Sequence, residues 1–381
     1  MNNESKPFAI NASSLRAYTI LIALAVIWAF FYYATNGVFL TPRNLSNLSL
    51  QTATTGILAV GMLMVIVAGQ IDLSVGSVLA LAGGASAIAF TNYNAGFVPA
   101  VLIAVFVSLL IGTLQGSLVA YLKIPAFIVT LGGLLVWRGA IKGITKGETI
   151  PVNNPVYNSV GQSYIPSSIG WTLAVVAILA IIWFSFQKYR SDRKSGNEQT
   201  GLTIILPAII LPIFGILTFT AVMNYYAGVP IAVLILIAVA ITGAFVTNNT
   251  VFGRYLYAMG GNADAARLSG INIKRNIVYV YALLGVLTGI AAVINVARGA
   301  SAGPDDGTLL ELDAIAACVI GGASLVGGRG TIFGACLGAL IMTSLDNGMS
   351  LLNVSDFLQD VIKGSILVLA VGFDMAGRKT N

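Results

Sequence analysis

The stretch Gly69-Gln70-Ile71-Asp72-Leu73-Ser74-Val75-Gly76 interrupts a long run of apolar residues. A second carboxylate stretch, Leu310-Glu311-Leu312-Asp313-Ala314-Ile315, occurs far downstream in equally apolar surroundings. The tetrapeptide Gly-Gly-Ala-Ser follows each of them, at 83–86 and at 321–324. Two halves built on one plan, each with a carboxylate embedded in hydrophobic sequence, are typical of membrane carriers that place a polar path between repeats. The pattern therefore predicts a transporter.

The composition excludes an ordinary soluble domain. Hydrophobic residues make up 57% of the chain and charged residues 9%, against about 25% charged residues in soluble proteins. Apolar windows of about 18 to 22 residues recur, which is the length that crosses a hydrocarbon core about 30 Å thick. We expect an all-α polytopic membrane protein with about 10 to 12 transmembrane helices in a single domain, 1–381. The expected spans lie near 17–36, 52–69, 73–92, 98–122, 126–145, 169–187, 202–221, 229–248, 277–297, 313–328, 331–349 and 357–374.

The order of these spans predicts an inverted repeat. Spans two to five, at about 52–145, correspond to spans nine to twelve, at about 281–375, and the spans at about 169–221 are an insertion between the two repeats. The two halves are an odd number of spans apart, so they must face opposite directions, with a substrate path along their interface. The tenth span, 313–328, is short and rich in glycine, and either crosses the membrane or re-enters it.

Basic residues predict the orientation. Placing the N- and C-termini in the cytoplasm puts most of the 20 basic residues on that side, as the positive-inside rule requires. Lys142 and Lys146 run counter to this topology. They precede an outer loop, 147–168, whose prolines and asparagines predict ordered turns. The net charge of +6 is explained by a surface that faces lipid headgroups, and no nucleic-acid partner is indicated.

Asp72 is the position with the sharpest functional signal, because a carboxylate inside a membrane segment is costly. It either caps the start of the third span by accepting backbone N–H bonds or lines the route of a polar solute. The same alternatives apply to Glu311 and Asp313. A neutral solute favours a route of amide, hydroxyl and small groups, with Asp72 and Asp313 at its two ends. The predicted substrate path is Gln70, Asp72, Ser74, Thr130, Asp313 and Asn347.

The segment 253–275 predicts a second kind of site. Asn262 is a good N-cap and Gly270 a good residue to follow a helix end, so a helix of about two turns is expected between them. Its basic flanks and cytoplasmic place favour a docking loop for a partner protein, formed by Asn262, Asp264, Arg267, Leu268 and Gly270. The alternative is an ordinary amphipathic connector.

Catalytic, metal and cofactor sites are not expected. The chain has no histidine, and Cys318 and Cys336 lie in apolar segments without metal-ligand spacing. A Gly-x4-Gly-Lys-[Ser/Thr] phosphate loop is also missing from the sequence. Any ATP hydrolysis would therefore belong to another chain. Lys363 follows Asp360 by three residues, which predicts an ion pair within one helix.

Three motifs carry a family resemblance: the segment 51–84 with Ile-Asp-Leu-Ser-Val-Gly-Ser, the loop 258–271, and the run 311–325. Over about 40–375 the chain resembles the membrane permeases of bacterial ATP-binding-cassette importers for ribose, galactose and xylose. The resemblance implies a homodimer in the bacterial inner membrane, a separate cytoplasmic ATPase docked at 262–270, and a periplasmic sugar-binding protein.

The length, the extra spans around 188–201 and the segment Ser344-Leu-Asp-Asn-Gly-Met-Ser350 most resemble xylose-type members of that family. This resemblance implies D-xylose as the transported sugar. The alternative is an ion-coupled secondary sugar transporter, in which Asp72, Glu311 or Asp313 couples proton or sodium flow to solute movement.

Overall fold

A computed structural model describes residues 12–194 and 202–376. The two ends of the chain and part of the hydrophilic stretch 188–201 lie outside these residues. The described elements are α1 (Ala12–Ala34), η1 (Val38–Leu40), α2 (Pro42–Val67), α3 (Val75–Thr91), α4 (Phe97–Tyr121), α5 (Ala126–Thr145), β1 (Ile150–Pro151), α6 (Pro155–Gln162), β2 (Tyr164–Ile165), α7 (Ser167–Lys194), α8 (Leu202–Tyr226), β3 (Val229–Pro230), α9 (Ile231–Asn249), α10 (Val251–Gly261), α11 (Ala263–Leu268), α12 (Ile273–Gly299), β4 (Ser301–Ala302), α13 (Leu310–Ile320), α14 (Ile332–Leu351) and α15 (Asp356–Ala376).

The all-α polytopic membrane fold is confirmed. Eight described helices are long and apolar enough to cross a membrane: α2, α4, α5, α7, α8, α9, α12 and α14. The shorter apolar helices Thr19–Ala34, within α1, and α3 add to them. α15 is as long as a span, but it carries Asp356, Asp360 and Lys363. Among the described residues, the eight long helices and the two shorter apolar ones together number ten, at the lower end of the expected range.

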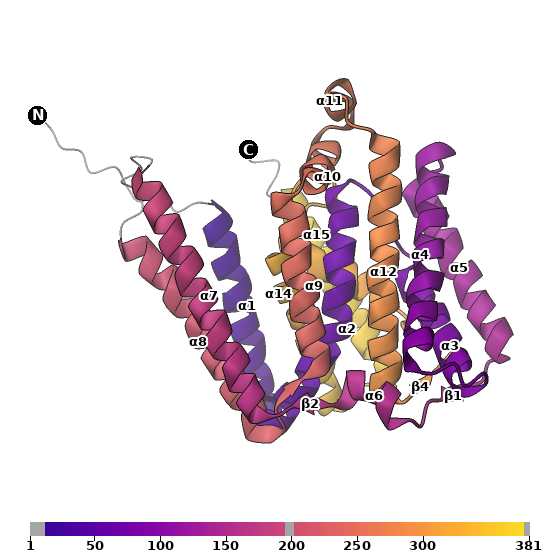
Figure 1. Cartoon of the computed structure of the whole chain (residues 1–381), viewed down its shortest axis with the longest axis horizontal. Helices are drawn as coiled ribbons and strands as arrows, with labels where there is room; N and C mark the ends of the chain where they lie inside the picture. The colour runs from indigo at the N-terminus through magenta and orange to yellow at the C-terminus, as the bar shows by residue number, and fades with distance from the viewer. Residues whose placement is uncertain (1–11, 195–201, 377–381) are drawn as a thin grey trace, which may run out of the picture.

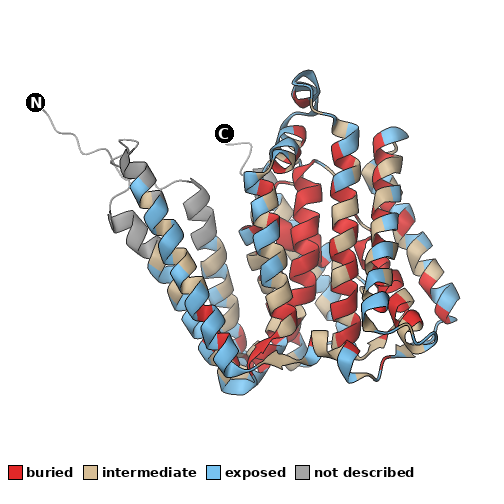
Figure 2. Ribbon diagram, in the orientation of Figure 1, coloured by how far each residue is buried: buried red, intermediate tan, exposed pale blue. Residues whose placement is uncertain are grey.

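Two helices form the centre of the bundle. α2 is the most buried of the long helices, and α12 and α14 follow it, whereas α4, α5 and α7 are more exposed (Figure 2). The exposed side chains of α4, α5 and α7 include large apolar ones that suit contact with lipid. α12 crosses α4 closely because glycines face each other there. A Cβ at Gly112 would meet the carbonyl oxygen of Tyr281, and one at Gly285 would meet that of Ser108. Small residues at such crossings allow membrane helices to pack backbone to backbone.

The contacts between helices follow a crossed pattern. α12 packs on α3 and α4, and α2 packs on α13 and α14. α3 packs on α4 as α13 packs on α14, and α5 touches α3 as α15 touches α13. The tetrapeptides do not share a conformation, however, because 83–86 lies inside α3 while 321–324 forms the turn after α13. The use of the tetrapeptide as a marker of equivalent positions was therefore wrong.

Two predicted spans have other boundaries in the structure. α2 begins at Pro42, well before the predicted 52, with the hydroxyl of Thr41 accepting the N–H of Asn44 at its N-terminus. Hydropathy missed this part because it carries buried polar residues. The predicted span 313–328 contains a helix of 11 residues, α13, which is only about 16 Å long at 1.5 Å per residue. This helix cannot cross the membrane alone, and the irregular segment 303–309 precedes it.

The outer loop 147–168 is ordered, as predicted. β1 pairs with β4 and β2 with β3, so the loop is joined by backbone bonds to two distant connections. Between them α6 places Tyr157 in the core, where its hydroxyl contacts that of Ser86 at 2.8 Å. These elements lie at the end of the bundle opposite α11, whereas α1 begins and α15 ends on the α11 side (Figure 1).

α1, α7 and α8 stand apart from the rest of the bundle (Figure 1). α7 packs on α8, α8 touches α2, and α1 touches α14. α7 and α8 contain the predicted insertion 169–221. The segments that carry the candidate sites all lie in the main bundle.

Candidate functional site

The break between α2 and α3 holds a buried polar network. Oδ1 of Asp72 accepts hydrogen bonds from the backbone N and the hydroxyl of Ser74, both at 2.7 Å. The Ser74 hydroxyl also contacts the amide of Gln115 on α4. This backbone bond lies before α3, whose N-cap residue Ser74 has no side-chain capping bond, so Asp72 fixes the turn that leads into the helix.

One further predicted path residue, Thr130, reaches the break at a backbone carbonyl oxygen, that of Ile71. This oxygen lies 3.4 Å from the hydroxyl of Thr130 on α5 and accepts a hydrogen bond of 3.1 Å from Tyr281 on α12. Thr130 is buried and Gln70 is half-buried beside the break. The structure thus brings Asp72, Ser74 and Thr130 together.

Asp313 and Asn347 lie elsewhere. Nζ of Lys363 on α15 is 3.3 Å from Asp313 on α13 and 2.8 Å from Asp346 on α14. The expected pair of Lys363 with Asp360 was wrong, because α15 turns this lysine toward two neighbouring helices. Asn347 accepts a hydrogen bond of 2.8 Å from Asn44 at the start of α2. Ser74 and Asn347 are both buried within the protein and do not face lipid.

A polar cavity of about 400 Å³ lies between α2, α12, α14 and the segment 303–309. Its lining residues are Gln51, Thr54, Thr55, Asn295, Arg298, Asp305, Asp306, Gly307, Thr308, Leu310, Thr343, Asp346 and Ser350. None of the predicted path residues is among them. On α2, α12 and α14 the lining residues recur every three or four positions, with Thr54 and Thr55 adjacent on α2, which makes a polar stripe on one face of each helix. That spacing is the signal that sequence reasoning missed.

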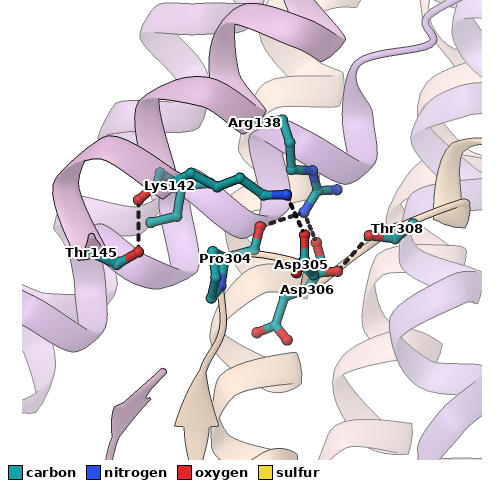
Figure 3. Close-up of polar contacts among 8 residues, drawn as sticks. Arg138, Lys142, Thr145, Pro304, Asp305, Asp306 and Thr308 are labelled. Carbon is teal, nitrogen blue, oxygen red and sulfur yellow. Dashed lines mark hydrogen bonds and ion pairs between the residues drawn. The ribbon is translucent and has the colours of Figure 1, made fainter. Parts of the chain in front are cut away.

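The segment 303–309 forms one wall of this cavity and is held by α5 (Figure 3). Nη1 of Arg138 donates to the carbonyl oxygens of Pro304, at 2.8 Å, and of Asp306, at 2.6 Å. Nζ of Lys142 lies 2.8 Å from the exposed carboxylate of Asp305. The hydrogen bond from Lys142 and its charge lower the pKa of Asp305. This pairing gives Lys142, an exception to the positive-inside rule in the expected topology, a local role.

The same segment closes against α3. A Cβ added to Gly76 would meet the carbonyl oxygen of Gly307 and a carboxylate oxygen of Glu311. Glu311 is buried, and its Oε2 has no hydrogen-bond partner in the structure. The first turn of α3 and the segment before α13 therefore meet without space between their backbones, beside the wall of the cavity.

The predicted docking loop has the expected local structure. Oδ1 of Asn262 accepts the N–H of Ala265 at 2.9 Å, which caps the six-residue helix α11. Gly270 has a φ of +83° after the helix end. The side chains of Asp264 and Arg267 point to solvent with nitrogen and oxygen 3.9 Å apart, and Leu268 is 90% exposed.

α10 connects this loop to both breaks in the bundle. The hydroxyl of Tyr257 donates to the carbonyl oxygen of Gly330 at 2.8 Å. A Cβ at Gly327 would lie 2.9 Å from the Cα of Gly260 and 3.0 Å from that of Gly69. We call Gly69, Gly260 and Gly327 the glycine junction. At this junction α10 touches the α2–α3 break and the α13–α14 connection at once.

Comparisons with known proteins identify the family. The family described as the permease component of branched-chain amino acid transport systems matches residues 44–371. The xylose transport system permease protein of Haemophilus influenzae is 44% identical over 98% of this chain and 99% of its own length. The corresponding xylose protein of Escherichia coli K12 is 41% identical over 97% of this chain and 94% of its own.

The ribose import permease protein of Escherichia coli K12 is 35% identical over 97% of this chain and 95% of its own length. No solved structure matches the chain. The match over most of the chain agrees with the apolar helices and with the two polar breaks between them. The chain belongs to the family of multi-pass membrane permease components of transport systems.

Proposed function

We propose that the chain is the membrane subunit of an ATP-driven importer for a monosaccharide, D-xylose. The observation that carries this proposal is the lining of the polar cavity, in which Leu310 is the only large aliphatic residue. A branched-chain amino acid, which the family description names, needs apolar surface for its side chain. A pentose instead presents hydroxyls that donate and accept hydrogen bonds. The names of the similar xylose and ribose permeases agree with the sugar.

The energy source in this proposal is a separate cytoplasmic ATPase, since the sequence has no phosphate-binding loop. Leu268, almost fully exposed at the tip of the docking loop, offers apolar surface to such a partner. The chain itself then has no enzymatic activity. A periplasmic sugar-binding protein delivers the sugar to the opposite face, and a second copy of the permease completes a homodimer in the inner membrane, with both termini cytoplasmic.

The inverted repeat is part of this proposal and is supported by the crossed packing of α2–α5 and α12–α15. In such a repeat the solute path follows the interface between the halves. The cavity has walls from α2 in one half and from α12 and α14 in the other. Of the predicted path residues, Asp72, Ser74 and Thr130 then act near the inner end of that interface.

Reconstitution in liposomes tests the proposal. The permease with its ATPase and binding protein is expected to accumulate labelled D-xylose when ATP is present, and an excess of leucine is expected not to compete. The permease alone is expected to show no accumulation under a proton or sodium gradient. Accumulation by the lone chain would favour the ion-coupled alternative, and accumulation of leucine in place of xylose would reject the sugar.

A further inference from the structure

The polar cavity has the features of a binding site and not only of a water-filled passage. Its volume of about 400 Å³ lies within the range of about 300 to 1,000 Å³ that small-molecule sites occupy. It reaches the surface at Asp305 and Thr308, which are exposed on the outer side. Its inner side is closed by the contact of Gly76 with Gly307. One end is therefore accessible and the other sealed.

Two polar atoms beside this cavity have no hydrogen-bond partner. The Oγ1 of Thr54, whose side chain is 3% exposed, and the Nε of Arg298 are both buried and unpartnered. Such groups are rare in folded proteins because each loses its bonds to water without replacement. Both residues line the cavity, so a polar ligand that enters it can supply the missing partners when these side chains turn toward it. These atoms point to an occupant with both donors and acceptors.

The charges around the cavity favour a neutral occupant. Arg298 supplies donors, and Asp306 and Asp346 supply acceptors on other walls. Asp346 is already paired with Lys363 at 2.8 Å. An anion would face the carboxylates, and a cation would face Arg298, whereas a sugar hydroxyl can satisfy either kind of group.

We propose that the permease itself binds one monosaccharide in this cavity before inward release, with Thr54, Arg298 and Asp306 as its hydrogen-bonding walls. This inference rests on the proposed function, and it places the sugar at residues other than the predicted substrate path. Arg138 positions the wall that carries Asp306 by holding the backbone of 303–309. The binding protein then selects the sugar first, and the cavity selects it a second time.

The first test replaces Thr54 with valine, which has the same shape but no hydroxyl. Because the hydroxyl has no partner in the empty protein, Thr54→Val should not lower the thermal midpoint of the purified permease. It should lower kcat/KM for D-xylose uptake by the full complex by about 3- to 10-fold, the effect of one lost hydrogen bond. The matched control is Thr247→Val, a buried threonine on α9 outside the cavity, which should leave kcat/KM nearly unchanged.

The second test measures occupancy without transport. Ser350→Cys places a thiol on the cavity lining, and Ser168→Cys places one on the same outer face away from it. Millimolar D-xylose should slow labelling of the first thiol by a charged, membrane-impermeant reagent, and leucine should not. Labelling of the second thiol should not change with either solute.

The results separate this inference from the proposed function. If the wild-type complex accumulates xylose but Thr54→Val transports normally, or xylose gives no protection of the thiol at 350, the cavity is not a sugar site and the importer proposal survives. If Thr54→Val also unfolds at a lower temperature, its hydroxyl has a structural role and the assignment of Thr54 is wrong. If the wild-type complex does not accumulate xylose, both proposals fail.

Discussion

Arg138 should control the position of the cavity wall, and its replacement gives a prediction that can be worked out from the contacts. Arg138→Met keeps the length of the side chain but removes both hydrogen bonds to the carbonyl oxygens of Pro304 and Asp306. A hydrogen bond from a charged donor contributes about 1.5 to 3 kcal/mol. Because the side chain is half-buried, we take the lower value, so two bonds give about 3 kcal/mol, or roughly a hundredfold shift toward a released wall.

Hydrogen exchange of the full chain in nanodiscs measures this shift directly. The amides of 303–309 should exchange much faster in Arg138→Met, and D-xylose uptake by the complex should fall. Lys142→Met is the matched control one helical turn away. Its partner Asp305 is exposed, and exposed ion pairs contribute little, so this variant should show a small effect. Equal exchange rates in the two variants, or normal exchange in Arg138→Met, would refute the role given to Arg138.

Three further predictions concern the docking loop, the ion pairs of Lys363 and the contact between Gly76 and Gly307. Arg267→Glu should uncouple ATP hydrolysis from sugar uptake while leaving membrane insertion intact, and normal uptake would remove the docking loop from the mechanism. Lys363→Met should lower the thermal midpoint, because it leaves the buried carboxylate of Asp313 without its cation; adding Asp313→Asn should restore part of the loss, and no recovery would argue against the pair. Gly76→Val should abolish uptake because the valine side chain would overlap the backbone of Gly307. Normal uptake would show that the backbone at Gly307 can move aside without loss of function.

The fold was predictable from the sequence because hydropathy reports helix length directly. Hydropathy located nearly all the long helices. The turn-forming residues of 147–168 and 262–270 predicted ordered elements there, and the structure contains them. Hydropathy missed the first turns of α2 because residues such as Asn44 are polar and buried there. Hydropathy cannot distinguish a polar residue paired inside the bundle from one in water.

The candidate site was predictable only in part. Asp72 and Ser74 were found because they break an apolar run, and their pairing follows from their closeness in sequence. The cavity was missed because its polar residues come from three helices and one irregular segment, and each stripe alone resembles an ordinary packing face. Lys363 was assigned to the wrong partner for a related reason, since Asp346 and Asp313 reach it only through tertiary packing.

The two-residue strand pairs at the end of the bundle opposite α11 have a consequence for the rate at which a partner associates there. β1–β4 and β2–β3 fix the loop 147–168 before any partner arrives. A protein that lands on this face therefore finds a rigid surface, and little conformational entropy is lost when the two meet. Encounter there should be limited by diffusion and orientation instead of by loop ordering. Cutting the chain once within 147–168 would then slow association far more than it would speed dissociation.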